Sequence, residues 1–181
     1  MTEIKLHIGG NEPHPEWKIL DIETRPEVDY IGDASDLRQF EDNSIASIYA
    51  SHVLEHFYYS IDNELINTLK EWYRVLKPGG QLFISVPDLR KLCWLYLHPE
   101  FKFAERTHIM RIIFGGQTNI YDVHKVGFDV ELLVIYLAEV GFKEYQQVSE
   151  FNLFNDSSTI RILDTLISLN VITTKPKTSN D

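Results

Sequence analysis

The sequence predicts a single α/β domain, whose seven-stranded and mostly parallel sheet is covered on both faces and carries an antiparallel hairpin at one edge. Its 181 residues suffice for one domain with a proper hydrophobic core. Short apolar runs alternate with segments of helical periodicity, which is typical of parallel strands joined by helices. The last two apolar runs have no clear helical pattern between them, so we expect these two strands to pair antiparallel.

Five runs in the first half of the chain predict strands, because each is rich in Ile, Val or Leu and is bounded by Gly, Pro, Asp or Asn. These runs are Ile4–Ile8, Lys18–Ile22, Val28–Ile31, Ser44–Ala50 and Gln81–Val86. Two late runs complete the sheet, at about Glu144–Phe151 and Leu166–Thr174. Only residues 11–17 separate the first glycine loop from the second strand, so we expect the first helix to be shortened or missing.

The clearest helical pattern lies between the fourth and fifth strands. Apolar side chains recur at helical spacing from Leu65 to Leu76, with Asp62 as the expected N-cap. The sequence Lys77-Pro78-Gly79-Gly80 is expected to end this helix with a glycine turn. Three further helices are predicted after Pro87 as far as Tyr96, at about Glu105–Phe114, and at about Val130–Val140 with its end at Gly141.

Composition limits the expected partners and location. The formal net charge is −10, and no stripe of Lys and Arg could neutralise a run of phosphates, so we expect no nucleic-acid partner. The N-terminus lacks the layout of a signal peptide and the longest apolar run, Leu132–Ala138, is too short to span a bilayer, so we expect a cytoplasmic protein with no membrane partner. Cys93 is the only cysteine, and its apolar neighbours favour a packed thiol. We expect residues 1–174 to form the domain and residues 175–181 a polar tail.

Candidate binding residues follow four of the predicted strands, and ligands of open parallel sheets bind beyond the carboxyl ends of the strands. In chain order these residues are Gly9 and Gly10, Asp21 and Ile22, Asp33 and Ala34, and Ser51 and His52. A carboxylate such as Asp21 has two acceptor oxygens, which suit the two hydroxyls of a ribose. Glu23 is the alternative if the strand runs longer, and an Asp that merely forms a turn is also compatible with the pattern. The double glycine likewise fits a plain tight turn.

Three landmarks occur together in the order and spacing of one superfamily: Gly32-Asp33-Ala34, Ser51-His52-Val53-Leu54-Glu55-His56 and Leu76-Lys77-Pro78-Gly79-Gly80. Over roughly residues 4–150 the chain resembles a class I S-adenosylmethionine-dependent methyltransferase, most closely the type 11-like branch that acts on small molecules. The resemblance implies a doubly wound, Rossmann-like methyltransferase domain with S-adenosylmethionine as cofactor. It also implies direct in-line displacement, by which a small-molecule acceptor takes the methyl group.

The resemblance also implies a role for each candidate residue. Asp21 would bind the ribose, Asp33 the adenine amino group and the Ala34 N–H an adenine ring nitrogen. The glycine loop and the pair Ser51 and His52 would lie beside the methionine part. Because the first loop keeps only part of the family's glycine pattern, a degenerate methyltransferase-fold protein, acting as a binding or regulatory partner without turnover, is the alternative.

The run His52-Val53-Leu54-Glu55-His56 also matches the H-x-x-E-H signature of inverted zinc peptidases, in which two imidazoles bind the metal and the Glu is the general base. That interpretation requires a helix, whereas an apolar strand runs directly into Ser51, and no downstream acid stands out as a third ligand. We therefore predict no metal site, give His56 a structural role, and keep a zinc hydrolase acting through His52, Glu55 and His56 as a remote alternative.

The segment Tyr121–Phe128 is predicted to close over the acceptor side of the site. Three glycines can serve as hinges, at Gly115, Gly116 and Gly127. Tyr121 and Phe128 would exclude water. His124 is the candidate catalytic residue, because an imidazole with a pKa near neutrality can take a proton from an acceptor hydroxyl or amine. Its structural alternative is to cap a loop or helix.

Overall fold

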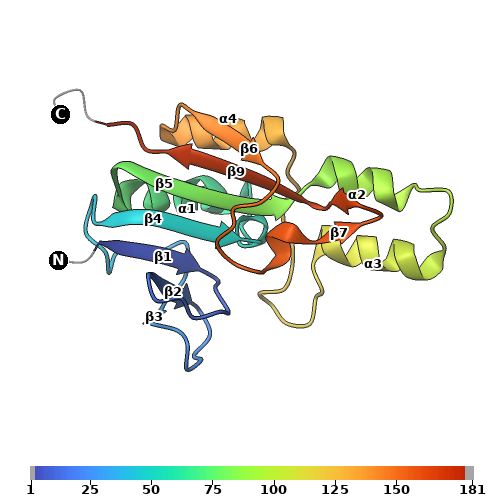
Figure 1. Cartoon of the computed structure of the whole chain (residues 1–181), viewed down its shortest axis with the longest axis horizontal. Coiled ribbons are helices and arrows are strands. Elements are labelled where there is room, and N and C mark those ends of the chain that lie inside the picture. Colours follow the sequence, from blue (N-terminus) through green and yellow to red (C-terminus); the bar gives the residue numbers. More distant parts are fainter. Residues whose placement is uncertain (1–2, 178–181) are drawn as a thin grey trace.

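The computed structural model describes residues 3–177. Its central sheet has seven strands in the order β3-β2-β1-β4-β5-β9-β6, and β9 runs antiparallel to both of its neighbours, while β1 to β5 are parallel (Figure 1). The strands are β1 (Ile4–Ile8), β2 (Trp17–Asp21), β3 (Tyr30–Ile31), β4 (Ile45–Ser51), β5 (Leu76–Pro87), β6 (Tyr145–Val148) and β9 (Ser168–Thr174). The predicted fold class is confirmed, including the antiparallel pair at the edge.

No helix lies between β1 and β4 in the described part of the chain, so the first helix is missing, and β1 is joined to β2 by a tight connection with a bridge between His14 and Trp17. The helices that cover the sheet, α1 (Glu64–Val75) and α4 (Val130–Val140), share one apolar core with it. Burial of these large apolar side chains is the main stabilising term of the domain. Members of this core include Leu6, Ile48, Leu82, Trp72 and Leu137.

The opposite face of the sheet is covered by a loop instead of helices. The connection that follows β6 brings Phe151 and Phe154 against aromatic side chains of β2, β4 and β5. The ring of Phe154 lies 4.1 Å from that of His7 on β1. In the same connection Asp156 accepts a hydrogen bond of 2.7 Å from the hydroxyl of Tyr49. Both faces are thus covered as expected, but aromatic rings of the loop replace the helices on this face.

Both ends of α1 differ from the prediction. Asn63 occupies the N-cap position, and Asp62 and Asn63 both adopt left-handed backbone conformations with φ of 53°, so Asp62 does not cap the helix. At the other end Leu76 is extended, fully buried and paired with Ile45 of β4, so the helix stops before the glycines. The register then shifts, and the next pair between the two strands is Ser47 with Gln81. Gly79, in the intervening residues 77–80, has a φ of +81°, so the glycine turn lies within β5 and not at the end of the helix.

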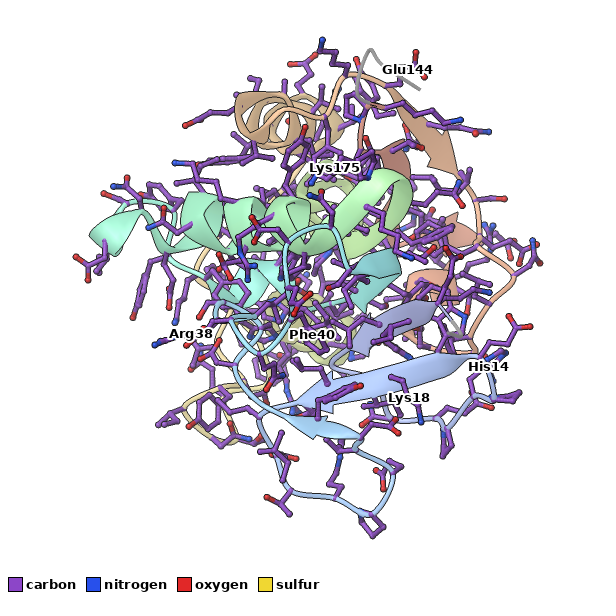
Figure 2. The ribbon with its side chains drawn as sticks, turned by 90° about the vertical axis from the view of Figure 1, so that its left-hand side faces the viewer. His14, Lys18, Arg38, Phe40, Glu144 and Lys175 are labelled. Carbon is purple, nitrogen blue, oxygen red and sulfur yellow. The ribbon has the colours of Figure 1, made fainter. Side chains whose placement is uncertain are left out.

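Lys175 closes the C-terminal end of α1. Its ammonium donates hydrogen bonds to the carbonyl oxygens of Tyr73 (2.7 Å) and Leu76 (2.8 Å) and to the side chain of Asn43 (2.8 Å). Figure 2 shows this side chain beside the helix, where a positive charge also suits the helix dipole. Burial lowers the pKa of Lys175. The first residue of the predicted tail is therefore part of the domain, and the last four, 178–181, lie outside the described residues.

Two further helices, α2 (Leu89–Tyr96) and α3 (Phe103–Phe114), extend beyond the end of β5 beside the small hairpin of β7 (Arg161–Ile162) and β8 (Thr165–Leu166) (Figure 1). They have a small core of their own, formed with Phe101 and Ile167. Cys93 on α2 is exposed, so the expectation of a packed thiol is wrong. Within residues 3–177, no helix combines the length and the apolar character that a membrane crossing requires.

Candidate functional site

A pocket of about 260 Å³ opens at the carboxyl ends of β1 to β4, where ligands of such sheets bind. Its volume lies just below the usual range of about 300–1,000 Å³ for small-molecule sites. Of the predicted cofactor residues, the following line it: Gly9, Asp21, Ile22, Asp33, Ala34 and His52. Gly10 and Ser51 do not. The structure thus brings together residues from four separate strands that sequence reasoning grouped by position alone.

Asp21 stands at the end of β2 and is held from two sides. Its Oδ1 accepts a hydrogen bond from the backbone N–H of Glu23 (2.8 Å), and its Oδ2 accepts one from the guanidinium of Arg25 (2.9 Å). Arg25 also donates to the carbonyl oxygen of Gly10 (2.7 Å) and to the side chain of Asn11. Arg25 therefore ties the loop after β1 to the end of β2, in addition to the hydrogen bond of 2.9 Å from the Gly9 N–H to the Leu20 carbonyl oxygen.

The turn after β3 is anchored on both sides. One oxygen of Asp33, Oδ1, accepts hydrogen bonds from the N–H (2.8 Å) and the hydroxyl (2.7 Å) of Ser35, which is a local turn typical of Asp. The carbonyl oxygen of Ala34 accepts a hydrogen bond of 2.8 Å from the indole of Trp72, deep in α1. The backbone around Asp33 and Ala34 is therefore held in place without using the second carboxylate oxygen of Asp33.

The two glycines after β1 have different roles. Gly9 has a φ of +71°, and a Cβ there would lie 2.9 Å from the Val53 side chain, so this position both forms the turn and leaves space at the pocket wall. A Cβ at Gly10 would meet the imidazole of His7 at 2.6 Å. Gly10 is thus required by packing against His7 and not by the pocket.

Ser51 and His52 end β4 in different environments. The hydroxyl of Ser51 is buried without a hydrogen-bond partner in the described structure. His52 adopts a left-handed conformation (φ 55°), and its Nε2 lies 2.9 Å from the hydroxyl of Ser168. Its Nδ1 lies 3.4 Å from Oε1 of Glu55. Burial, with a contribution from His124, lowers the pKa of His52 to about 4, so this imidazole is neutral near pH 7.

The next residues form a short 3-10 turn, Leu54–His56, in place of the α-helix that the inverted zinc-peptidase motif needs. Glu55 on this turn is fully buried, and neither of its carboxylate oxygens has a hydrogen-bond partner. Burial raises the pKa of Glu55 to about 8. His124 comes from a distant part of the chain, and its Nε2 lies 3.9 Å from Oε1 of Glu55.

His124 does not line the pocket. Its imidazole packs edge-on against that of His56, with ring centroids 4.8 Å apart. Burial and the neighbouring His56 lower the pKa of His124 to about 4. His124 therefore lies behind His56, which lines the pocket, and its role as the catalytic residue facing the transferred methyl group stays a prediction. Its proximity to Glu55 was missed, because the two residues are far apart in sequence and no local pattern connects them.

The predicted cover lies partly at the pocket, through Ile120, Tyr121 and Lys125. The ammonium of Lys125 lies 4.0 Å from the ring centroid of Tyr58 and 3.7 Å from a carboxylate oxygen of Glu64. Phe128, in contrast, is fully buried in the core and cannot act as a cover.

The glycines proposed as hinges are close-packed. A Cβ at Gly115 would lie 2.5 Å from the backbone oxygen of Asp122, and one at Gly127 would lie 2.8 Å from the Leu89 side chain. Asp122 also accepts hydrogen bonds from the N–H groups of Gly116 (3.0 Å) and Thr118 (3.2 Å). These glycines therefore permit tight contacts around a loop organised by Asp122.

Comparisons with known proteins agree with this geometry. The family model described as "Methyltransferase domain" matches residues 12–84, from the loop after β1 into β5. A solved SAM-dependent methyltransferase from Archaeoglobus fulgidus is similar in structure, with a TM-score of 0.60 and 17% identity over 96% of this chain and 86% of that chain. No curated protein matches the sequence.

Two other solved structures share the fold. A chain of the Haloferax volcanii complex that contains the Trm112 methyltransferase activator has a TM-score of 0.57 and 13% identity, over 99% of this chain and 85% of that one. Human N-acetylserotonin methyltransferase in complex with SAM has a TM-score of 0.53 and 13% identity, over 97% of this chain but only 48% of that one. The family match thus covers residues 12–84, and the structural similarity shows that nearly the whole chain has the fold of the S-adenosylmethionine-dependent methyltransferases.

Proposed function

We propose that this methyltransferase binds S-adenosylmethionine in the pocket at the ends of β1 to β4 and transfers its methyl group to a small-molecule acceptor. The observation that carries the proposal is the convergence of Gly9, Asp21 and Asp33 on one pocket from three different strands. Two carboxylates and a wall without a side chain are suited to a ligand that has a ribose diol, an exocyclic amino group and a close approach to the backbone.

The residues present fit this cofactor. Gly9 leaves a space that any Cβ would fill, and Asp21 retains unused acceptor capacity beside its bonds to Arg25 and Glu23. Asp33 has one carboxylate oxygen outside its local turn. When bound, the cofactor supplies an electrophilic methyl group, which an acceptor oxygen, nitrogen or carbon takes in a single displacement.

The chain contributes mainly by position. Alignment of two bound reactants can account for about 7–11 kcal/mol of barrier reduction, so a transfer of this kind needs no covalent intermediate on the protein. His52, neutral near pH 7, lies at the pocket wall and orients its ring through Ser168. Tyr121 and Lys125 border the pocket from the segment after α3. From this position they would flank a bound acceptor and limit the access of water.

The proposal is tested by titrating the protein with S-adenosylmethionine and S-adenosylhomocysteine in a calorimeter, with thermal denaturation in parallel. Ligand at a hundred times its dissociation constant should stabilise the fold by about 2.7 kcal/mol. Adenosine, which lacks the methionine part, serves as a weaker-binding control. No heat and no thermal shift at millimolar concentration of either cofactor form would refute the proposal.

A second candidate function is that of a binding or regulatory partner that retains the fold without turnover. The observation that favours it is the ion pair of Arg25 with Asp21, which engages the carboxylate expected to bind ribose. If the protein binds S-adenosylhomocysteine, the cofactor site is intact, and the form of this second candidate in which the site is lost is excluded. Methyl transfer from labelled S-adenosylmethionine to a pool of small-molecule acceptors would then establish turnover.

A further inference from the structure

We propose that Glu55, His56 and His124 form a binding site for one divalent transition-metal ion of the zinc class, at the edge of the cofactor pocket. The potential ligand atoms of these three side chains all lie within 4.8 Å of one another. Two imidazoles and one carboxylate are a common set of ligands for Zn²⁺ and its first-row neighbours. Of these three residues only His56 also lines the cofactor pocket, and the metal site does not require that the cofactor be bound.

The buried carboxylate is the observation that points to a ligand. Glu55 has no solvent exposure, and both of its oxygens lack a hydrogen-bond partner in the described structure. A buried polar group in that condition is costly, by several kcal/mol for a charged group, and such groups are normally paired or coordinate a metal. The side chains around Glu55 offer imidazoles and not a fixed cation, with His52 Nδ1 at 3.4 Å and His124 Nε2 at 3.9 Å from its Oε1.

His56 is oriented in the way that metal-binding histidines are. Its Nδ1 lies 3.1 Å from the carbonyl oxygen of Val123, so Nδ1 carries the proton and donates it to that carbonyl. The free lone pair is then on Nε2. A hydrogen bond from the second ring nitrogen to a backbone carbonyl is the usual partner interaction of a ligating imidazole, since it fixes both tautomer and ring orientation.

The spacing requires only a small contraction. Ligand atoms about 2.0–2.1 Å from a tetrahedral zinc ion lie about 3.4 Å apart, so atoms that are now up to 4.8 Å apart must approach one another by up to about 1.4 Å. His124 and His56 are carried by separate segments, residues 122–125 and the turn Leu54–His56, which are joined by a hydrogen bond of 2.8 Å from the Lys125 N–H to the Glu55 carbonyl oxygen. The ion would hold the covering segment against this turn.

The test is made on the full chain without a histidine tag. After incubation with Zn²⁺ and dialysis, wild-type protein should retain one equivalent of zinc by mass spectrometry and melt at a higher temperature than the metal-free protein. With Co²⁺ in place of zinc, visible absorption bands should report tetrahedral coordination. Glu55→Gln preserves the size of the side chain, and His124→Gln is a second variant. Loss of a residue that only hydrogen-bonds to a metal ligand typically weakens metal binding by about 10–100-fold. Each of these two variants loses a ligand itself and should weaken zinc binding by more than that.

His108→Ala is the matched control, because His108 is exposed on α3 and its loss should leave the zinc content unchanged. Circular dichroism establishes that each variant is folded. The proposal is overturned if wild-type protein retains no zinc and its melting temperature does not rise with Zn²⁺, Mn²⁺ or Fe²⁺. This test does not depend on the folding of any variant. Equal zinc binding by wild type and Glu55→Gln would also overturn it. Neither outcome bears on the binding of S-adenosylmethionine, which is measured separately.

Discussion

The assignment of Asp21 to a ribose leads to a specific expectation for Asp21→Ala. A carboxylate has about four acceptor positions. Two are used by Arg25 and by the N–H of Glu23, which leaves two for the two hydroxyls. Hydrogen bonds to a charged group are worth about 1.5–3 kcal/mol, so Asp21→Ala should weaken cofactor binding by about 10- to 150-fold. Calorimetry with S-adenosylhomocysteine measures this change directly.

Arg25→Leu separates the two possible roles of Asp21. If the carboxylate binds the ribose, Arg25→Leu should weaken cofactor binding less than Asp21→Ala does, because only the support of the Gly10 loop is lost. If Asp21 serves only to hold Arg25 and the Gly10 loop, both variants should lose affinity to the same extent, and the ribose assignment is then wrong. Asp36→Ala is the control for a general loss of negative charge, because Asp36 pairs with Arg38 on the surface and does not line the pocket.

Three further predictions concern the support of the site. Lys175→Met should lower the free energy of unfolding by about 2–4 kcal/mol in a denaturant titration, because buried carbonyls at the end of α1 lose a charged donor. Lys177→Met, at an exposed position, is the control and should leave the free energy of unfolding unchanged. Equal stabilities of the two variants would contradict this account. Burial lowers the pKa of His7 to about 4, so its contribution to stability is complete above about pH 7 and is lost as the pH falls from 6.5 towards 4. Between pH 7.5 and 4.5 the free energy of unfolding of His7→Phe should therefore fall by about 2 kcal/mol less than that of wild type. If the free energies of unfolding of the two proteins fall in parallel with pH, His7 does not contribute in this way. Gly9→Ala should lower the free energy of unfolding by about 1–2 kcal/mol, because alanine disfavours the positive φ at this position. The added methyl group contacts Val53 and should also weaken cofactor binding. Wild-type affinity in this variant would show that the pocket wall at Gly9 is not close to the ligand.

The fold could be predicted because its strands and helices have strong local signals. The strands are short runs rich in Ile, Val and Leu, and α4 spans Val130–Val140 and stops at Gly141, as its pattern predicts. The errors lie where a tertiary contact outweighs a local preference. Burial of Leu76 ends α1 before the glycines, and the distant Lys175 binds the carbonyl oxygens at the end of that helix.

The site was predictable to the extent that it follows from strand order. Parallel strands place their carboxyl ends at one edge of the sheet, so Gly9, Asp21 and Asp33 could be grouped without a structure. The ion pair of Arg25 and the approach of His124 to Glu55 were not accessible in this way. Both depend on where loops pack, and such loops have no periodicity from which a contact can be read.

The loop that covers the second face has a consequence for how the chain folds. His7 on β1 packs on Phe154, and Tyr49 on β4 bonds to Asp156, so partners for the earliest strands come from near the end of the chain. Contacts of such long sequence separation slow folding. During synthesis, the aromatic side chains of the first strands stay uncovered until the ribosome has released the C-terminal loop. Residues 12–84, although sufficient for recognition of the family, should not fold as an independent unit.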